Sequence, residues 1–384
     1  MLDQKLIDRE YSYLGDVVFA DFSTVSMPPL RVQRMWKEYI EGYVRAFGSN
    51  YPDYFTDKTA ATRKEMAALF RVSPEEIAFT HSASDSMTIL ANSFPFLQGD
   101  NVIVTSEEHA SNVVPWLALE RRGIEVRVVH SVDGAVSVDS LLAAADERTR
   151  IISVASVFFC SGYAIDLKAL GEGCRKRSIT LAVDGTQSVG KLALYPKELG
   201  VDYLAGGGHK GLLGTKSVGF AYCSKELLAR LTPYTGSLQG VLNAGRPCTL
   251  EHYDQIQWAN TASKLESGNY PFATVEAMGT GASLINELGI ENVEARIRQT
   301  EDTLREKLAM LPLKTNDFPK ENRSGLVFIH FPERVDAERV REILWKYKVR
   351  AVVRYDYIRL SLHFINTPGQ MDRVADALAE ISEL

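Results

Sequence analysis

Between about residues 75 and 225, short β-rich runs alternate with amphipathic stretches, and this alternation limits the possible folds more than any other feature of the chain. The β-rich runs lie at 77–80, 102–105, 126–129, 151–154, 181–183 and 218–222. Several of them are apolar throughout, which indicates strands covered on both faces, as in a mostly parallel sheet between helices. We therefore expect an α/β fold in which ligands bind beyond the carboxyl ends of the strands.

After Pro271 the pattern changes to a long helical stretch, further strands at 325–329 and 349–353, and a closing helix from about Thr367. This pattern predicts a small α/β domain. A single core stops growing near about 250–300 residues, so a chain of 384 residues is expected to form two domains. We predict an N-terminal arm that packs with the small domain, a large domain, and a linking helix with the small C-terminal domain, at 1–20, 21–265 and 266–384.

Composition and charge argue against several classes of protein. The net charge is -6 and the longest basic tract is Arg175–Arg177, so we expect no nucleic-acid partner. The cysteines at 160, 174, 223 and 248 are widely spaced, which argues against a zinc site or a disulfide framework, and we expect no metal. Neither a signal pattern nor an apolar run of about 18 residues occurs, so we expect no membrane contact and a cytoplasmic location.

Two residues near strand ends carry a chemical signal as a pair. Asp184 follows the apolar run 181–183, and Lys210 follows the glycine-rich run 205–208. A lysine can form a Schiff base with the aldehyde of pyridoxal 5'-phosphate (PLP), and a buried carboxylate nearby favours the protonated ring nitrogen. Alone, Asp184 is more simply a turn cap and Lys210 a surface residue. Together they predict a PLP site.

The run Ser82–Ser84 follows a strand and opens the helix that runs toward Phe94. Amide groups at a helix N-terminus and serine hydroxyls bind phosphate well. Ser82, Ala83 and Ser84 are therefore expected to hold the cofactor phosphate. The simpler alternative is an ordinary helix cap, and the pairing with Lys210 favours the phosphate site.

As a set, these residues resemble the class V aminotransferase family of fold-type I PLP enzymes, which includes cysteine desulfurases, isopenicillin N epimerase-like proteins and C-S lyases. The resemblance covers nearly the whole chain and rests on the segments Ser82–Ser84, Glu108–Trp116, Ser161–Leu167, Val183–Ser188, Gly207–Lys210, Glu266–Asn269 and Arg359–Leu362. It implies a large domain with a mostly parallel seven-stranded sheet, a small C-terminal α/β domain, PLP as cofactor, an amino acid as substrate, and a homodimer with active sites at the interface.

The resemblance also implies roles for single residues around the cofactor. His109 stacks on the ring, where it can relay protons, and Gln187 hydrogen-bonds the phenolic oxygen. His209, next to the linking lysine, donates to the phosphate, and Gly207 belongs to the same loop. Asn269 is expected to reach the phosphate group of the neighbouring subunit, although the threonine frequent in this loop of the family is absent.

Three residues are expected at the substrate. Arg359 clamps the α-carboxylate, a bidentate task that suits a planar guanidinium, and the simpler alternative is an ion pair on an edge strand. Arg354, five residues earlier, is more often structural but could contact a second substrate acid. Asn112, within the Glu108–Trp116 segment, is also expected to contact the substrate.

Two departures from the family limit the chemistry. Desulfurases carry a catalytic cysteine just before the carboxylate-binding arginine, because sulfur transfer needs a thiolate. The stretch Val349–Arg359 has no cysteine and predicts a short hairpin, and Cys160 is expected to be a small buried residue. Where relatives place an amide near the ring, this chain has Phe158 and Phe159, and we expect at least one of them to pack beneath the sheet.

The expected reaction removes a group from the substrate Cα, with Lys210 as Schiff-base lysine and then as base, and Asp184 as counter-charge to the ring. β-Elimination of the C-S lyase type is slightly favoured, because several relatives with a shortened cysteine loop cleave C-S bonds. The alternatives are an amino-acid epimerase, with His109, Tyr163 or Tyr270 as second acid, an aminotransferase, and a PLP-binding scaffold without turnover.

Overall fold

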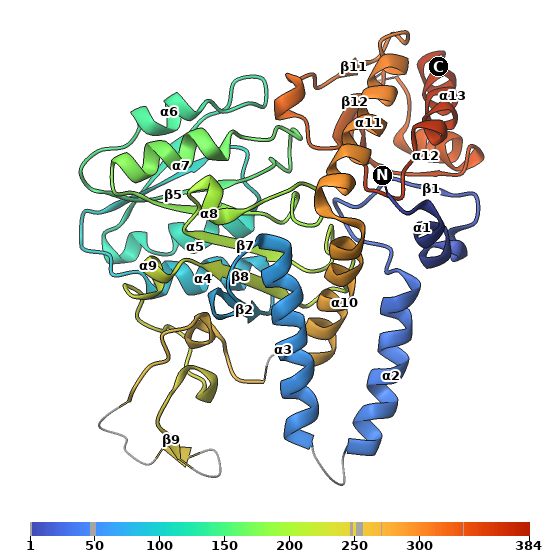
Figure 1. Cartoon of the computed structure of the whole chain (residues 1–384). Helices are drawn as coiled ribbons and strands as arrows, with labels where there is room; N and C mark the ends of the chain where they lie inside the picture. The colour runs from blue at the N-terminus through green and yellow to red at the C-terminus, as the bar shows by residue number, and fades with distance from the viewer. Residues whose placement is uncertain (1, 47–50, 246–248, 251–255, 270, 333) are drawn as a thin grey trace.

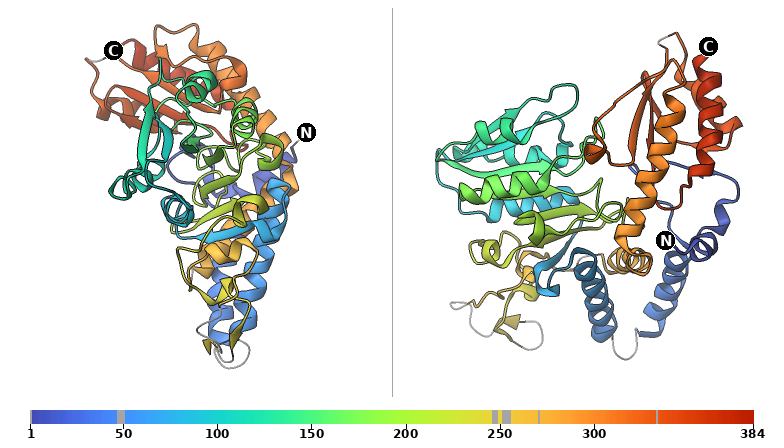
Figure 2. Two further views of the ribbon diagram at one scale, coloured as in Figure 1. Left: turned by 90° about the vertical axis from the view of Figure 1, so that its left-hand side faces the viewer. Right: turned by 45° about the horizontal axis from the view of Figure 1, so that its top comes forward.

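The computed structural model describes residues 2–46, 51–245, 249–250, 256–269, 271–332 and 334–384. A seven-stranded sheet between helices forms one part of the molecule, and a four-stranded sheet with its own helices lies beside it (Figure 1). The helices α2 (Leu30–Ala46) and α3 (Tyr51–Phe70) extend away from both sheets. In both views of Figure 2, these two helices and the small domain lie at opposite ends of the molecule.

In the large sheet the strand order is β2-β8-β7-β6-β5-β3-β4. β8 runs antiparallel to β2 and β7, and the other neighbouring pairs are parallel. This arrangement confirms the α/β fold with a mostly parallel seven-stranded sheet. In chain order the strands are β2 (Ile77–Thr80), β3 (Asn101–Thr105), β4 (Glu125–Val129), β5 (Thr149–Ala155), β6 (Thr180–Asp184), β7 (Tyr203–Gly207) and β8 (Gly219–Cys223).

β7 is the strand that the β-rich pattern does not reveal. Its last residues, Gly206 and Gly207, belong to a glycine-rich run that reads as a loop, because glycine has a low strand propensity. In the folded chain a Cβ at position 206 would lie 2.6 Å from the Phe220 ring, so glycine lets β7 pack against that side chain. The strand places Lys210 just beyond its carboxyl end.

Helices cover both faces of the large sheet, which explains why its strands are apolar throughout. Successive side chains of a strand point to opposite faces. Leu181 and Val183 of β6 therefore join one core, whereas Ala182 joins the other. The first core includes α6 (Val138–Ala143), α7 (Leu167–Lys176) and α8 (Pro196–Leu199), and the second includes α4 (Ala83–Ser93), α5 (Val114–Leu117) and α9 (Lys225–Leu228).

The small domain is built on an antiparallel sheet of strand order β11-β12-β15-β14. Its strands are β11 (Lys314–Thr315), β12 (Leu326–His330), β14 (Val352–Arg354) and β15 (Tyr357–Ser361), and its helices are α11 (Ile290–Leu308), α12 (Ala337–Lys346) and α13 (Met371–Ser382). The N-terminal segment contributes α1 (Gln4–Glu10) and β1 (Val18–Phe19), and β1 pairs in parallel with β13 (Val349–Arg350). The first residues of the chain are thus tied to the C-terminal part by backbone hydrogen bonds.

The long helix α10 (Phe272–Leu288) connects the two parts and packs against α2 and α3. Gly279 allows a close approach to α3, because a Cβ there would lie 2.8 Å from the Cα of Thr62. Between α9 and α10 the chain also forms the short strands β9 (Ala244–Gly245) and β10 (Thr249–Leu250). Within the described residues, the helices are too short or too polar for any of them to span a bilayer.

Candidate active site

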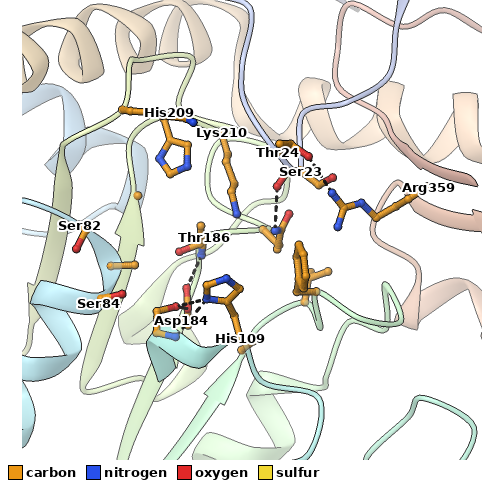
Figure 3. A pocket seen from close by; sticks show the side chains of 18 of the residues that line it. Ser23, Thr24, Ser82, Ser84, His109, Asp184, Thr186, His209, Lys210 and Arg359 are labelled. Carbon is orange, nitrogen blue, oxygen red and sulfur yellow. Dashed lines mark hydrogen bonds between the residues drawn. The ribbon is translucent and has the colours of Figure 1, made fainter. Parts of the chain in front are cut away.

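One cavity lies at the carboxyl ends of the large-sheet strands, where the small domain faces them (Figure 3). Side chains reach it from the ends of β2, β3, β5, β6 and β7 and from the β14–β15 hairpin. Segments far apart in the sequence therefore meet at this edge, as parallel strands require. The predicted residues that line the cavity are Ser82, Ala83, Ser84, His109, Asp184, Gln187, Gly207, His209, Lys210, Arg354 and Arg359.

Lys210 supplies an amine to this cavity. Burial lowers its pKa from 10.5 to about 8, an effect that nearby Asp184 opposes and Arg359 reinforces. More of this amine is neutral near pH 7 than of an ordinary lysine, and a neutral amine is the form that attacks an aldehyde. In Figure 3 the Lys210 side chain extends from the loop after β7 toward Thr186.

Asp184 supplies a carboxylate to the same cavity, at the last position of β6, and is only 4% exposed. Its Oδ1 accepts a hydrogen bond from the backbone N–H of Thr186 at 2.9 Å, and its Oδ2 accepts one from the Ser111 hydroxyl at 3.4 Å. The two bonds hold the carboxylate in one orientation. A buried carboxylate of this kind favours a cationic partner such as a protonated ring nitrogen.

The N-terminus of α4 forms another wall. Ser82 is the helix cap, and its Oγ accepts a hydrogen bond from the backbone N–H of Asp85 at 3.1 Å. Ser84, in the first turn, is exposed and lines the cavity. A Cβ at Gly219 would lie 2.5 Å from the carbonyl carbon of Ser82, so glycine is required for α4 to begin against β8. This end of the cavity suits an anion.

His109 follows β3 and lies beside Asp184 in Figure 3. Its Nδ1 accepts a hydrogen bond from the backbone N–H of Ser111 at 3.2 Å and lies 2.8 Å from the Ser111 hydroxyl oxygen. Its ring meets the Phe159 ring nearly edge-on, with centroids 5.5 Å apart. Burial and the charge of Lys210 lower the His109 pKa, so the imidazole is neutral near pH 7. A fixed neutral ring can lie flat on a cofactor.

Three further polar residues, Gln187, Thr186 and His209, line the cavity. Gln187 donates from Nε2 to the Ser23 carbonyl at 3.3 Å, while its buried Oε1 has no hydrogen-bond partner among the described residues. The buried Oγ1 of Thr186 likewise has none within that part of the chain. Burial lowers the pKa of His209 to about 4, so it is neutral near pH 7. Buried polar atoms without partners are costly, which indicates that a ligand completes the site.

Arg359 enters the cavity from the small domain and is only 1% exposed. Its Nη2 donates to the Thr24 hydroxyl at 2.9 Å, and its Nε is buried without a partner among the described residues. The guanidinium carbon lies 4.7 Å from the centre of the Phe159 ring. Most of its five donors therefore stay available for a carboxylate.

Two residues lie elsewhere than the sequence predicts. Asn112 is fully buried, does not line the cavity, donates from Nδ2 to Glu108 at 2.7 Å and accepts from the Ser153 hydroxyl at 2.6 Å. With both ends of its amide bonded inside the protein, it has nothing to offer a substrate. Cys160 is exposed rather than buried, because it lies on the turn beyond Phe159. Phe158 packs in the core, as expected for one of the two phenylalanines.

Two residues named from the sequence are not part of the cavity in this chain. Asn269 is exposed, has a φ of 53° and does not line the cavity, so its contact with a neighbouring subunit stays a prediction. Tyr270 lies outside the described residues. Tyr163 packs against Phe158 and Phe318 and also does not line the cavity.

Sequence reasoning missed several lining residues, among them Ser23, Ser111, Thr186 and Lys216. Ser111 and Thr186 lie within the segments Glu108–Trp116 and Val183–Ser188, so those segments were the available signal. Ser23 and Lys216 carry no local signal, because isolated serines and lysines are common in loops. They are found only when the folded chain brings them to the cavity.

The arrangement fits PLP, which carries a phosphate, a ring nitrogen and an aldehyde. The N-terminus of α4 suits the phosphate, Asp184 the protonated nitrogen, and Lys210 the aldehyde. Thr186 and Gln187, each with a buried oxygen that lacks a partner among the described residues, line the same cavity. No group of three or more metal-ligating side chains occurs in the part of the chain that the structure describes.

Comparisons with known proteins agree with this geometry. The family model described as aminotransferase class-V matches residues 18–354. A probable cysteine desulfurase of Methanothermobacter thermautotrophicus is 30% identical over 301 residues, which cover 77% of this chain and 74% of that protein. An uncharacterized aminotransferase of Bacillus subtilis, YcbU, is 28% identical over 348 residues, covering 91% of this chain and 90% of the relative.

Among solved structures, the cystine C-S lyase C-DES is similar in fold. Its complex with the product cysteine persulfide superposes with a TM-score of 0.87 at 20% identity and covers 97% of this chain and 100% of that one. A variant of C-DES with glycine covalently linked to PLP gives the same TM-score and identity, and the match covers 97% of this chain and 99% of that one. This likeness shows that the fold is shared over nearly the whole chain.

Proposed function

The chain belongs to the class V aminotransferase family and is a PLP-dependent enzyme, and on that premise we propose that it cleaves the Cβ–S bond of an α-amino acid by β-elimination. One observation carries this proposal: the Lys210 amine, the Asp184 carboxylate and the Arg359 guanidinium line a single cavity. The cavity therefore combines a base, a counter-charge for a cationic ring, and a clamp for an α-carboxylate.

Bound PLP supplies an aldehyde that captures the substrate amine and a cationic ring that accepts an electron pair. Arg359 binds the α-carboxylate and thereby fixes which bond of Cα faces the Lys210 amine. Lys210 takes the Cα proton, and Asp184 balances the charge at the ring nitrogen. The Cβ–S bond then breaks, its electron pair leaves on sulfur, and the sulfur is released as a thiol. Hydrolysis of the remaining fragment yields pyruvate and ammonia.

Elimination is favoured over epimerisation because the described candidates for a second acid, opposite Lys210, are poorly suited to donate a proton. An epimerase needs a second acid on the opposite face of the substrate. Of the candidates within the described residues, His109 lines the cavity and Tyr163 does not. Burial lowers the His109 pKa, so its imidazole is a poor proton donor near pH 7. An elimination needs only the base on one side.

Sulfur transfer through a protein thiol is disfavoured by the β14–β15 hairpin. Arg354 pairs with Tyr357, so the turn contains only Tyr355 and Asp356. No cysteine lies between Val349 and Arg359 in the sequence. The sulfur product is therefore expected to leave as a free thiol or persulfide rather than on the enzyme.

The proposal is tested by incubating the purified holoenzyme with L-cysteine, L-cystine and β-chloro-L-alanine and measuring pyruvate and ammonia. We expect both products in equal amounts, and none from the Lys210→Ala variant. Deuterium exchange at Cα without pyruvate would favour the epimerase, and conversion of a keto acid to an amino acid would favour the aminotransferase. If absorbance at the visible edge survives dialysis but no amino acid is altered, the protein is a scaffold.

We also propose that the enzyme is a homodimer. Ile40 and Val44 of α2 are 59% and 70% exposed, and Leu242 and Trp258 are also exposed apolar residues. Apolar side chains of this size gather at interfaces. Asn269 would then contact the neighbouring subunit's phosphate group. Analytical ultracentrifugation at low and high protein concentration decides this, and a monomer at all concentrations would contradict it.

A further inference from the structure

Two guanidinium groups face the cavity from the same hairpin. In β14 and β15, Arg359 pairs with Val352 and Arg354 pairs with Tyr357. Residues two apart along a strand point to the same face, so Arg354 and Arg359 are diagonal neighbours on one face, with Cα atoms roughly 7–8 Å apart. Both line the cavity.

Arg354 has donors to spare. Its side chain is exposed and makes no hydrogen bond or ion pair with any described residue, whereas exposed arginines nearby on α12 are paired, Arg339 with Glu342 and Arg341 with Glu338. Burial raises the pKa of nearby Asp21, and this outweighs the opposing effects of a hydrogen bond to Thr24 and of the charges of Arg359, Arg350 and Arg354. Asp21 does not line the cavity, and no ion pair joins it to either arginine.

The charges around the cavity leave Arg354 without an assigned partner. Among the described residues, four cationic side chains line it together with one carboxylate, Asp184; the cations are Lys210, Lys216, Arg354 and Arg359. Lys210 reacts with the aldehyde, and Arg359 binds the α-carboxylate. Lys216 is near His209, whose pKa it helps burial and Lys210 to lower, and His209 is the residue expected to donate to the phosphate. Neither the cofactor nor an amino acid with a single carboxylate offers an anionic partner to Arg354.

We propose that the substrate is an α-amino acid whose side chain ends in a second anionic group, such as a carboxylate or a sulfonate, and that Arg354 binds this group while Arg359 binds the α-carboxylate. This inference rests on the proposed function, because it assumes that Arg359 holds the α-carboxylate. Two cations on one rigid hairpin select for two anions at a matching spacing. An amino acid with a neutral side chain leaves Arg354 unpaired and therefore binds less tightly.

A matched substrate pair tests the second anion. S-carboxymethyl-L-cysteine and S-carbamoylmethyl-L-cysteine have the same leaving-group shape and differ only in charge. We expect the holoenzyme to release pyruvate from the carboxymethyl compound with a kcat/KM about tenfold higher than from the carbamoylmethyl compound. This factor is at the low end of what a hydrogen bond to a charged group contributes, because Arg354 is exposed. In Arg354→Gln that ratio should fall toward one, and Arg354→Lys should keep part of it.

Arg350→Gln is the matched control. It removes the same charge from the adjoining strand β13, but Arg350 does not line the cavity, so the preference should persist. Equal kcat/KM values for the two substrates, or a preference that survives Arg354→Gln, would overturn the inference. A preference lost equally in Arg350→Gln would also overturn it, because the effect would then be a long-range field rather than a contact.

A binding measurement separates this inference from the proposed reaction. The amine-free diacid 3-(carboxymethylthio)propanoate and its mono-amide, in which the carboxymethyl end is neutral, cannot be turned over. Calorimetric titration of the holoenzyme should give a dissociation constant about tenfold lower for the diacid, and the difference should vanish in Arg354→Gln. If no substrate yields pyruvate but the diacid still binds more tightly than its mono-amide, the proposed reaction is wrong and the anion site is supported. If pyruvate forms but the two compounds bind equally, only the anion site is rejected.

Discussion

The guanidinium carbon of Arg359 lies 4.7 Å from the centre of the Phe159 ring, which also meets the His109 imidazole edge-on at 5.5 Å. One aromatic side chain therefore touches both the carboxylate clamp and the ring expected to stack on the cofactor. Phe159 thus provides a packing contact that keeps the guanidinium oriented.

Replacing Phe159 with Leu should raise KM about fivefold to thirtyfold, because a desolvated cation–π contact contributes roughly 1–2 kcal/mol. Phe159→Tyr, which keeps the ring, should remain near the wild-type KM. Steady-state kinetics with a substrate of known turnover checks both values. A fall in kcat at constant KM would show instead that Phe159 acts through His109.

Introducing a negative charge at the N-terminus of α4 should weaken PLP binding. Ser84→Asp places a carboxylate against the phosphate, and like charges at a binding surface cost several kcal/mol. We expect the dissociation constant of PLP to rise by at least about tenfold, whereas Ser84→Ala should change it by only about threefold or less. Titration of the apoenzyme with PLP, followed by absorbance, gives both constants. Equal effects of the two variants would place the phosphate elsewhere.

The rate at which the apoenzyme captures PLP should depend on the protonation of Lys210. Its pKa is lowered from 10.5 to about 8, so the neutral, reactive amine is mostly absent below pH 7 and dominant above pH 9. The rate should rise with pH through a midpoint near 8. Arg359→Gln removes a cation that lowers this pKa, so the midpoint should move to higher pH. A midpoint near 10.5 in the wild type would mean that the amine is not desolvated.

Asn112→Ala distinguishes a structural role from a substrate contact. The variant leaves buried groups of Glu108 and Ser153 without partners, which should lower the free energy of unfolding by about 2 kcal/mol. KM should stay at the wild-type value, because the side chain does not line the cavity. Urea unfolding and steady-state kinetics measure the two quantities. A higher KM with unchanged stability would restore the substrate contact.

Much of the site could be predicted because its residues follow strands. Asp184 is the last residue of an apolar strand, and Ser82 caps a helix that begins directly after another strand. The carboxyl ends of parallel strands lie at one edge of the sheet. Local sequence and sheet topology therefore agree on these positions. The same reasoning did not place Asn112 correctly, because its segment reaches the site while its side chain points inward and donates to Glu108.

The sequence by itself determined the chemistry available at the strand ends: an amine at Lys210, a carboxylate at Asp184 and a helix N-terminus at Ser82. The tertiary structure alone decided that β7 is a strand, that Phe159 rather than Phe158 faces the cavity, and that Arg354 and Arg359 enter side by side from another domain. The physical reason is that which face a side chain takes, and what lies opposite it, depends on packing between elements distant in sequence.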